Sequence, residues 1–430
     1  MREEIGKSNS LVPLTLLRVM DQFYGIEHQS ARETLRPFGV ERKNSSKRKK
    51  PLRILYVTFL RYPNVGGLAS YIASVKTGFD SIGHRADVIS PLQMPPSYFQ
   101  EDIPRAADEI RAFLLGRYGA VNEKVVKNLS YLHVFQRFLN EKDLEQYDLF
   151  HAQDLFAVFL LGYLNQTYRR PLFFTPHGHF TKSRIKFHKI QKGSLEEAYF
   201  SEIERQGIRA SDKIITISDS FHAPLMDYGA KETQLKTVYT GIQFQPAPQQ
   251  KSAETLVITC VSRLTERKGH DVLLDALAQI QQHLSGIEIW IIGDGKMRKI
   301  LEEKRQKLGL TSVFFFGKRH DVPALLAESS IFVLPTLNDN FPVAIIEAMF
   351  SGKAIITSDC GGIPEMIRHE QTGLICQPGN SRELANALVL LITNKSFRER
   401  LGKEAHSYAT QYLRQDIMVS DIYSVYHSFL

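Results

Sequence analysis

The chain has 430 residues, of which 43% are hydrophobic and 23% are charged. A chain of this length exceeds one hydrophobic core and predicts two or more domains. Its three cysteines, Cys260, Cys360 and Cys376, have no CxxC spacing, so neither a disulfide framework nor a zinc knuckle is indicated, and a reducing compartment fits best. No run of 18 apolar residues occurs and the N-terminus lacks an apolar secretory core, so we expect a cytoplasmic protein without a transmembrane helix.

The net charge of +8 is concentrated near the N-terminus. Residues 1–53 contain 12 Lys or Arg and 6 Asp or Glu, which leaves +6 there and +2 for the rest of the chain. Residues 42–53 (RKNSSKRKKPLR) carry seven basic residues and no acidic one. We interpret 1–52 as a basic extension that ends either in a solvated linker or in a peripheral contact with an anionic membrane, at its inner face. Nucleic acid is not expected as a partner, because no recognition motif accompanies the charge.

Strands and helices alternate along the remainder of the chain. Residues 53–60 form a short apolar run typical of a buried parallel strand. Further strands are predicted at 84–90, 148–153, 171–177, 213–218 and 236–241. The amphipathic segment 94–145 is interpreted as a partly helical insertion in this first domain.

The polar segment 244–253 is the best predicted linker, and the alternation restarts after it. Strands are predicted at 255–262, 287–293, 313–317, 331–335, 354–358 and 373–377. We therefore predict an α/β protein in which two Rossmann-like, doubly wound domains, 53–243 and 254–405, face one another across a cleft, with a terminal helix at 406–430. Ligands of open parallel sheets bind beyond the carboxyl ends of the strands, which makes the cleft the expected site.

Two loops of the first domain carry candidate residues. Gly66 and Gly67 precede a helix, where paired glycines let the backbone approach a ligand and a helix start attracts anions. The strand 171–177 ends at His177, which is placed to hydrogen-bond a donor sugar or phosphate, with His179 as the competing candidate. An ordinary turn and a structural histidine are the alternative interpretations.

Two loops of the second domain carry charged residues after predicted strands. Arg263 and Lys268 suit phosphate oxygens, and a solvated loop is the alternative. In 335–349, Pro342 is predicted at the first position of a helix, with the amides of Val343 and Ala344 free for a phosphate.

Two acidic residues belong to the same stretch. Glu347 lies in apolar surroundings where a carboxylate needs a ligand such as two ribose hydroxyls, and Asp339 can accept from sugar hydroxyls. Asn340 and Phe341, which lie between these residues, are included in the predicted ligand site. The alternative is that Asp339 or Asn338 is only the N-cap of the helix and that Glu347 only interacts favourably with the helix dipole.

These loops, together with Cys360-Gly361-Gly362-Ile363-Pro364-Glu365, resemble the retaining glycosyltransferases of family 4, also called group 1. The resemblance covers about residues 53–405 and is strongest over 256–378. It implies the two-domain GT-B fold. The family's two acidic residues, separated by seven others, correspond to Asp339 and Glu347. The first is usually Glu followed by Gly, so Asp339-Asn340 is a departure that bears on the donor sugar.

The resemblance implies a hexosyltransferase that uses a nucleoside diphosphate sugar and needs neither a cofactor nor a metal. Glu347 would hold the ribose and Asp339 the transferred sugar. Arg263 and Lys268 would clamp the diphosphate, Gly67 would meet the phosphate, and His177 would lie near the donor sugar. The acceptor, whether a glycan, a lipid or a small molecule, is not indicated.

Three other classes remain as alternatives. A nicotinamide-dependent oxidoreductase needs GxGxxG after a strand, and the nearest match, 293–298, ends in Arg298. A nucleotide-sugar epimerase or a phosphorylase would use the same two-domain fold. A non-catalytic binding module would not need the full set of Arg263, Lys268, Asp339 and Glu347.

Overall fold

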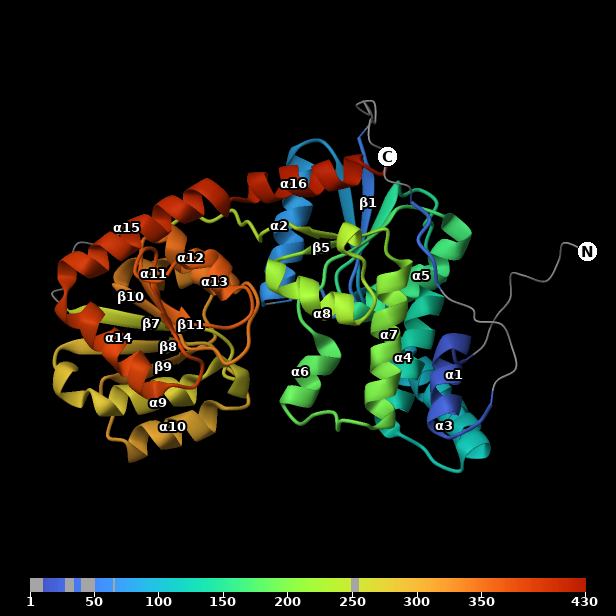
Figure 1. Cartoon of the computed structure of the whole chain (residues 1–430), viewed down its shortest axis with the longest axis horizontal. Coiled ribbons are helices and arrows are strands. Elements are labelled where there is room, and N and C mark those ends of the chain that lie inside the picture. The colour runs from blue at the N-terminus through green and yellow to red at the C-terminus, as the bar shows by residue number, and fades with distance from the viewer. Residues whose placement is uncertain (1–10, 28–34, 40–50, 65, 249–254) are drawn as a thin grey trace, which may run out of the picture. The chain divides into compact units, whose positions relative to one another are not determined.

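The computed structural model of the chain describes residues 11–27, 35–39, 51–64, 66–248 and 255–430 (Figure 1). Most of the basic segment 42–53 and the second half of the linker 244–253 lie outside the described residues. Two compact units are present: the first comprises Met1–Thr216, His222–Thr237 and Ile422–Leu430, and the second comprises Ile217–Phe221 and Val238–Asp421. Across the described ranges, no helix is both long enough and apolar enough to span a membrane.

The first unit is built on a six-stranded parallel sheet in the order β2-β1-β3-β4-β5-β6. Apolar runs form its interior, and every residue of β3 and β4 is buried. The strands lie within or close to the predicted segments but are mostly shorter, because the ladders end where the polar loops begin. They are β1 (Arg53–Val57), β2 (Arg85–Ile89), β3 (Leu149–Ala152), β4 (Leu172–Phe174), β5 (Lys213–Thr216) and β6 (Leu235–Thr237).

The second unit repeats the design with a parallel sheet in the order β12-β11-β10-β7-β8-β9. All six of its predicted strands are found. They are β7 (Leu256–Val261), β8 (Ile287–Ile292), β9 (Val313–Gly317), β10 (Ile331–Leu334), β11 (Ala354–Ser358) and β12 (Leu374–Cys376). Two parallel sheets with helical connections confirm the predicted α/β fold class.

Helices connect the strands in both units (Figure 1). The segment 94–145 contains two of them, α3 and α4, which pack against each other. The first unit contains α1 (Leu14–Phe23), α2 (Gly67–Ser81), α3 (Ile103–Tyr118), α4 (Glu123–Asn140), α5 (Leu155–Tyr168), α6 (Phe180–Lys186), α7 (Leu195–Ala210) and α8 (His222–Asp227). The second contains α9 (His270–Gln279), α10 (Arg298–Lys307), α11 (Val322–Glu328), α12 (Val343–Phe350), α13 (Ile363–Met366), α14 (Ser381–Thr393) and α15 (Lys395–Tyr412), and α16 (Gln415–His427) belongs partly to each.

The interpretation of residues 1–52 as an extension is wrong for α1. This amphipathic helix packs against α7, and Leu16 and Met20 on its inner face are fully buried. Its buried Asp21 accepts hydrogen bonds from Arg117 Nε at 2.6 Å and from the Tyr118 hydroxyl at 2.7 Å. Residues 14–23 are therefore part of the first unit, because their apolar face needs a partner to leave water.

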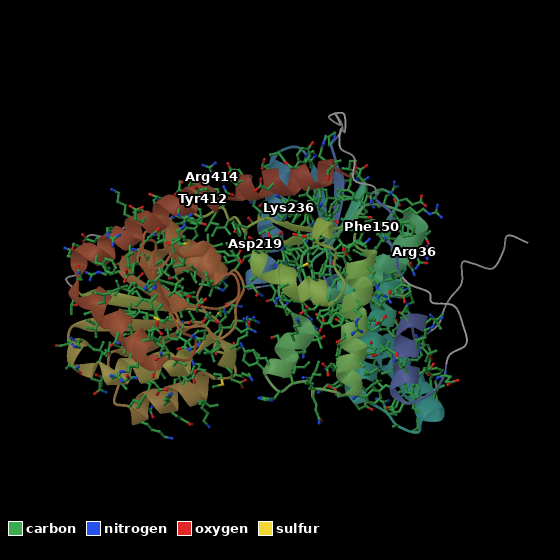
Figure 2. All side chains as sticks on the ribbon, in the orientation of Figure 1. Arg36, Phe150, Asp219, Lys236, Tyr412 and Arg414 are labelled. Atoms are coloured by element: carbon green, nitrogen blue, oxygen red, sulfur yellow. The ribbon has the colours of Figure 1, made fainter. Side chains whose placement is uncertain are left out.

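The single terminal helix predicted at 406–430 is also wrong: the chain forms α15 and α16, with a break between Tyr412 and Gln415 near Arg414 (Figure 2). The Leu413 carbonyl accepts from Ile242 N–H at 3.0 Å, and Gln415 N–H donates to the Ile242 carbonyl at 3.2 Å. The helix is interrupted because these groups bond to another segment instead of to their own helix.

The end of α16 completes the core of the first unit. Tyr426 is fully buried, and its hydroxyl hydrogen-bonds to His151 Nδ1 and lies 3.0 Å from the Tyr56 hydroxyl. Its ring lies 4.6 Å from that of Phe173 on β4. His151 Nε2 is in turn 2.8 Å from Thr175 Oγ1, so every polar group of this cluster has a partner.

Candidate functional site

Each sheet has one point where the strand order reverses, and polar residues gather there. In the first sheet it lies between β1 and β3, and in the second between β7 and β10. β7 and β10 are parallel neighbours, with Ile258 paired to Ile331, so the loops after them leave the same edge side by side. Such a point is the usual ligand site of an open parallel sheet.

Close backbone contacts hold the two loops of the second unit together. Leu337 N–H and the Thr336 hydroxyl donate to the Arg267 carbonyl, at 2.7 Å and 2.9 Å. Gly269 has φ of +68°, and a Cβ added to it would lie 1.9 Å from the Pro335 carbonyl oxygen. Only glycine fits at this position, so Gly269 allows the loop after β7 to pack directly against the loop after β10.

Asp339 is the centre of a small charged cluster formed by the loops after β7 and β10. Lys268 Nζ hydrogen-bonds to Asp339 Oδ2, and Arg267 Nη1 lies 3.6 Å from Asp339 Oδ1. Burial alone would raise the pKa of the Asp339 carboxyl, but the charges of Lys268 and Arg267 lower it below its ordinary value. Asp339 is therefore ionised at neutral pH. The N-cap of α12 is Pro342, so the alternative in which Asp339 or Asn338 occupies that position is wrong.

Arg267 is a site residue that sequence reasoning missed. Its Nη1 atom also donates to the Asn338 carbonyl at 2.9 Å, so it joins the two loops as well as facing Asp339. The residues Glu266–Lys268 form a single 3-10 turn, and the turn brings both Arg267 and Lys268 to the same carboxylate.

Arg263 is the exposed cation of the cluster. Partial burial and the positive charge of Arg267 lower the pKa of its guanidinium, so the two arginines repel one another. Arg263, Arg267 and Lys268 together carry three positive charges against the one negative charge of Asp339. The surplus of two positive charges makes this edge of the sheet attractive to a polyanion.

Helix α12 begins beside the cluster, one residue later than predicted. Pro342 has φ of −70° and ψ of 118°, so it precedes the helix as its N-cap and is not the first helical residue. Its carbonyl accepts the N–H of Ile345 at 3.0 Å. Val343 and Ala344 therefore contribute the first amides of the helix, which have no carbonyl partner in their own helix.

Glu347 lies on the second turn of α12, where it is mostly buried. Burial raises the pKa of its carboxyl to about 7. Among the described residues, its carboxylate has no hydrogen bond or ion pair. A buried acid without a partner is suited to accept hydrogen bonds from a ligand.

Asn340 and Phe341 lie in the loop before α12. The Phe341 side chain is buried and stacks on Tyr239, with 5.3 Å between ring centroids, so only its backbone is available to a ligand. A Cβ on Gly361, which has φ of +56°, would lie 1.9 Å from the Asp339 carbonyl oxygen. The glycines after β11 thus let a third loop support the Asp339 turn.

The first unit places its candidates around its own switch point. Gly66, with φ of +146°, precedes α2, which begins at Gly67. His177 Nε2 lies 3.2 Å from Gln153 Oε1 at the end of β3, and its ring lies 4.7 Å from that of Tyr71. Burial lowers the pKa of His177 to about 3, so its imidazole is neutral at physiological pH.

His179, the competing candidate, lies two residues further on at the start of α6. Burial and Lys182 lower its pKa to about 4, so it is also neutral. Gly66, Gly67 and His177 thus share one unit. Arg263, Lys268, Asp339, Asn340, Phe341, Val343, Ala344 and Glu347 share the other. No group of three or more His, Cys, Asp or Glu side chains among the residues with described positions is arranged to hold a metal ion.

Two family models match successive parts of the chain. The glycosyltransferase family 4 model matches residues 65–245, and the glycosyl transferases group 1 model matches residues 242–408. An uncharacterised glycosyltransferase of Methanocaldococcus jannaschii is 24% identical over 87% of this chain and 98% of its own length. The chain belongs to the group 1 family of GT-B glycosyltransferases and is a transferase.

Solved structures agree with the fold. Anabaena HepE, in complex with UDP and glucose, superposes with a TM-score of 0.64 at 19% identity, over 87% of this chain and 99% of that one. Sucrose-phosphate synthase of Thermosynechococcus elongatus superposes with a TM-score of 0.68 at 18% identity, over 87% of this chain and 98% of that one.

Proposed function

We propose that this glycosyltransferase is a retaining hexosyltransferase that takes its sugar from a nucleoside diphosphate donor. The observation that carries the proposal is the juxtaposition, in the second unit, of a surplus of two positive charges with the start of α12 and the unpartnered Glu347. A nucleoside diphosphate offers each of these groups a complement. That HepE was crystallised with UDP and with UDP-glucose supports the same donor class.

The donor binds through three contacts in this proposal. Glu347 accepts hydrogen bonds from the two ribose hydroxyls, because a carboxylate has acceptor sites for both. Arg263, with the cluster of Arg267 and Lys268 behind it, faces the diphosphate together with the amides of Val343 and Ala344. Asp339 accepts from hydroxyls of the transferred sugar while Lys268 keeps it ionised.

The transfer step needs no covalent intermediate on the protein. The bond between the anomeric carbon and the diphosphate oxygen breaks, and the acceptor oxygen bonds to the same face of that carbon. The proton of the acceptor hydroxyl passes to the departing diphosphate oxygen, which balances the charges. The positive cluster stabilises the charge that grows on the leaving diphosphate, so catalysis is electrostatic stabilisation and positioning, without metal or cofactor.

The first unit contributes neutral groups to this proposal. His177 acts as a hydrogen-bonding partner of the donor sugar and not as a proton donor, because its pKa of about 3 leaves the ring uncharged. Gly66 and Gly67 let the start of α2 approach the phosphate.

A donor screen tests the proposal. Melting is followed with UDP, GDP and ADP and with their hexose conjugates, since a ligand at 100-fold its Kd stabilises by about 2.7 kcal/mol. We expect one nucleoside diphosphate to raise the melting temperature and its hexose conjugate to be consumed with an acceptor. NMR of the product should then show the donor's anomeric configuration. An inverted product would contradict the retaining mechanism, and no response to any nucleotide would contradict the donor class.

We also propose a contact of the basic segment 42–53 with an anionic membrane. Deleting residues 42–50 removes six basic side chains and leaves the sequence of α1 intact. Binding to phosphatidylserine vesicles at low salt should fall, while transfer to a soluble acceptor continues. Equal vesicle binding by both forms would leave the segment as a linker only.

A further inference from the structure

Five aromatic rings of the first unit, which we call the ring row, lie along the carboxyl edge of its sheet. Phe59, Phe156 and Phe180 follow β1, β3 and β4, which are neighbours in that sheet. The Phe156 ring centroid lies 4.9 Å from that of Phe59 and 5.0 Å from that of Phe180. Beyond Phe59 the ring row continues to Tyr131 on α4, at 4.9 Å, and from there to Phe99, at 6.3 Å. All five residues are partly exposed, so the ring row belongs to the surface.

Hydrogen bonds hold the middle of the ring row in place. The Asp154 carboxylate accepts the N–H groups of both Phe59 and Phe156, the second at 3.1 Å. The loops after β1 and β3 are therefore fixed to one another. His177 precedes Phe180 by three residues in the loop after β4. The ring row thus begins close to the histidine that is proposed to contact the donor sugar.

An arginine lies at each end of the ring row. The Arg61 guanidinium is 5.7 Å from the centroid of the Phe99 ring, and the Arg184 guanidinium is 4.2 Å from the centroid of the Phe180 ring. Both arginines are exposed, and in the described part of the chain neither pairs with a carboxylate. A guanidinium that rests against a ring keeps its N–H groups at its own edge, where they can form paired hydrogen bonds with a carboxylate or a phosphate.

The segment that follows Phe180 adds positive charge at one end of the ring row. Residues 181–195 contain five Lys or Arg and no Asp or Glu. Lys189 and Lys192 are exposed, and across the described ranges neither has a carboxylate partner. The carboxylates beside this segment have partners of their own: Asp227 pairs with Lys182, Glu196 with Lys124, and Glu197 accepts the N–H of Gly193. This end of the ring row is therefore attractive to anions.

The rings and the cations together indicate the kind of ligand. Half-buried rings offer apolar contact area to the C–H face of a sugar ring and leave the hydroxyls of that sugar in water. A membrane contact needs apolar side chains that project from the surface, whereas all five rings are partly buried. Cations at both ends of the ring row fit anionic groups spaced along a chain better than a single charged headgroup.

We propose that the ring row binds the acceptor of this glycosyltransferase, and that the acceptor is an oligosaccharide carrying carboxylate or phosphate groups. Its sugar rings pack on the ring row, Arg61 and Arg184 bind its anionic groups, and the accepting hydroxyl lies toward His177. The inference rests on the proposed function only for the place of the donor sugar. Binding of the acceptor to the first unit can be measured without any donor.

Fluorescence anisotropy without donor tests the preference for charge. The probes are labelled oligosaccharides of one length: neutral dextran, phosphorylated dextran and oligogalacturonate. We expect an anionic probe to bind about tenfold or more tightly than the neutral one, with a preference that shrinks as salt rises. Arg61→Glu combined with Arg184→Glu should remove the preference. Lys299→Glu combined with Lys307→Glu is the matched control, because it makes the same charge change at two exposed cations of α10.

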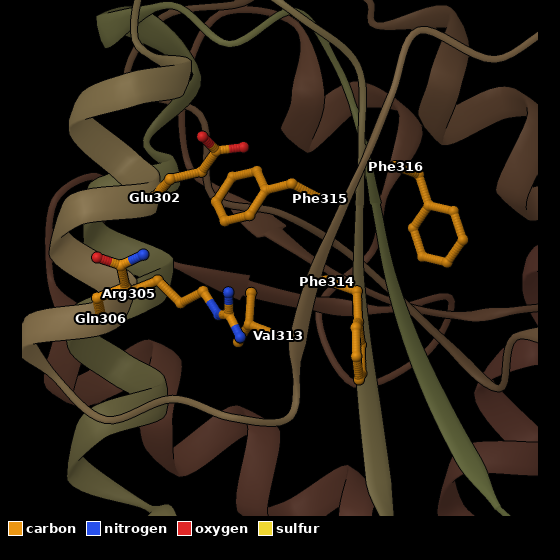
Figure 3. A pocket seen from close by; sticks show the side chains of 7 residues that line it. All are labelled: Glu302, Arg305, Gln306, Val313, Phe314, Phe315 and Phe316. Atoms are coloured by element: carbon orange, nitrogen blue, oxygen red, sulfur yellow. The ribbon is translucent and has the colours of Figure 1, made fainter.

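Tyr131→Ala tests the ring row itself. It should weaken the binding of neutral and anionic probes alike, because it removes apolar contact with the sugar. Phe314→Ala is the control: this ring is 42% exposed and lines the hollow beside α10 in the second unit (Figure 3), so its removal should leave probe binding unchanged. Melting temperatures show whether each variant is folded, and the two arginine substitutions test the proposal at exposed positions.

Equal affinity for neutral and anionic probes would overturn the proposal, as would equal effects of the two double charge reversals. It would also be overturned if the double variant of Arg61 and Arg184 lost affinity for phosphatidylserine vesicles or for a nucleoside diphosphate while its affinity for the anionic probes stayed unchanged. The arginines would then belong to a membrane contact or to the donor site. A wild-type protein that binds the anionic probes but no nucleotide would contradict the proposed donor class and leave this inference standing.

Discussion

Lys268 Nζ donates to Asp339 Oδ2, and this ion pair links the loop after β7 to the loop after β10. Both side chains are mostly buried, at 10% and 15% exposure. We therefore expect the pair to have a structural role in addition to its proposed role in donor binding, and the two roles can be separated. Lys268→Ala leaves Asp339 with Arg267 at 3.6 Å as its remaining cation.

We expect Lys268→Ala to lower the free energy of unfolding by about 2 kcal/mol or more, because it leaves a buried carboxylate poorly compensated. Adding Asp339→Asn should recover part of this loss, since the uncompensated charge disappears. Urea unfolding of the two single variants and the double variant measures the coupling. Strictly additive losses would show that the pair does not interact.

Glu347→Gln should weaken donor binding at least roughly tenfold, because hydrogen bonds to a charged acceptor are worth about 1.5–3 kcal/mol each. The nucleoside alone should lose as much affinity as the full donor, since the proposed contact is with the ribose. Calorimetric titration measures both. Glu303→Gln, on the exposed face of α10, is the control. A folded Glu347→Gln protein with unchanged donor affinity would refute the ribose contact.

Arg263→Ala should reduce turnover and the affinity for the nucleoside diphosphate but leave the affinity for the nucleoside nearly unchanged. In the proposed complex the guanidinium faces the diphosphate, and its charge matters most as that group leaves. Lys299→Ala, which removes an exposed cation from α10, is the control. Equal losses for the nucleoside and the diphosphate would place Arg263 elsewhere.

The titration of Glu347 predicts a pH dependence of stability. Burial raises its pKa from 4.5 to about 7. Between these pH values the folded protein holds a proton that the unfolded chain has released, so the free energy of unfolding falls as pH rises through this window. The loss is about 3 kcal/mol by pH 7 and is absent in Glu347→Gln. The assignment would be contradicted if, without ligand, the free energy of unfolding of the wild type rises with pH in this window and that of Glu347→Gln does not.

Donor binding should show the opposite trend, because the ionised carboxylate is the better acceptor of ribose hydrogen bonds. Affinity for the nucleoside should therefore increase up to about pH 7 and then level off. The same titrations on Glu347→Gln should give a flat profile.

Turnover should survive an excess of EDTA. In the proposed mechanism the leaving diphosphate meets the surplus of two positive charges around Asp339 and about half a charge at the start of α12. That sum is comparable to the charge of the leaving group. Complete loss of turnover in EDTA, restored by magnesium or manganese, would show that a metal ion does this work instead.

The sequence alone was sufficient for the sheets and for the positions of most loops that carry the candidate residues. Apolar runs ending in polar turns located twelve strands, because parallel strands buried on both faces leave this pattern. The candidate residues of the second unit could then be grouped, because loops that follow neighbouring parallel strands leave the sheet at the same edge. Arg267 was missed because the path of one 3-10 turn, and not residue type, decides that it faces Asp339.

The two ends of the chain show the other limit of sequence reasoning. The residues of α1 have the pattern of an amphipathic helix, but this pattern does not indicate that α1 packs against α7. The break at Leu413 depends on hydrogen bonds to Ile242, about 170 residues away in sequence. Contacts over such distances leave no local signal.

The burial of Tyr426 in the first unit has a consequence for how the protein is made. The last residues, 422–430, complete a core whose other members, Tyr56, His151 and Phe173, are synthesised hundreds of residues earlier. During translation the first unit must therefore stay incompletely packed until residues 422–430 have left the ribosome. A fragment ending near residue 240 lacks the ring that fills this core and should aggregate, whereas adding a peptide of residues 411–430 in trans should rescue it.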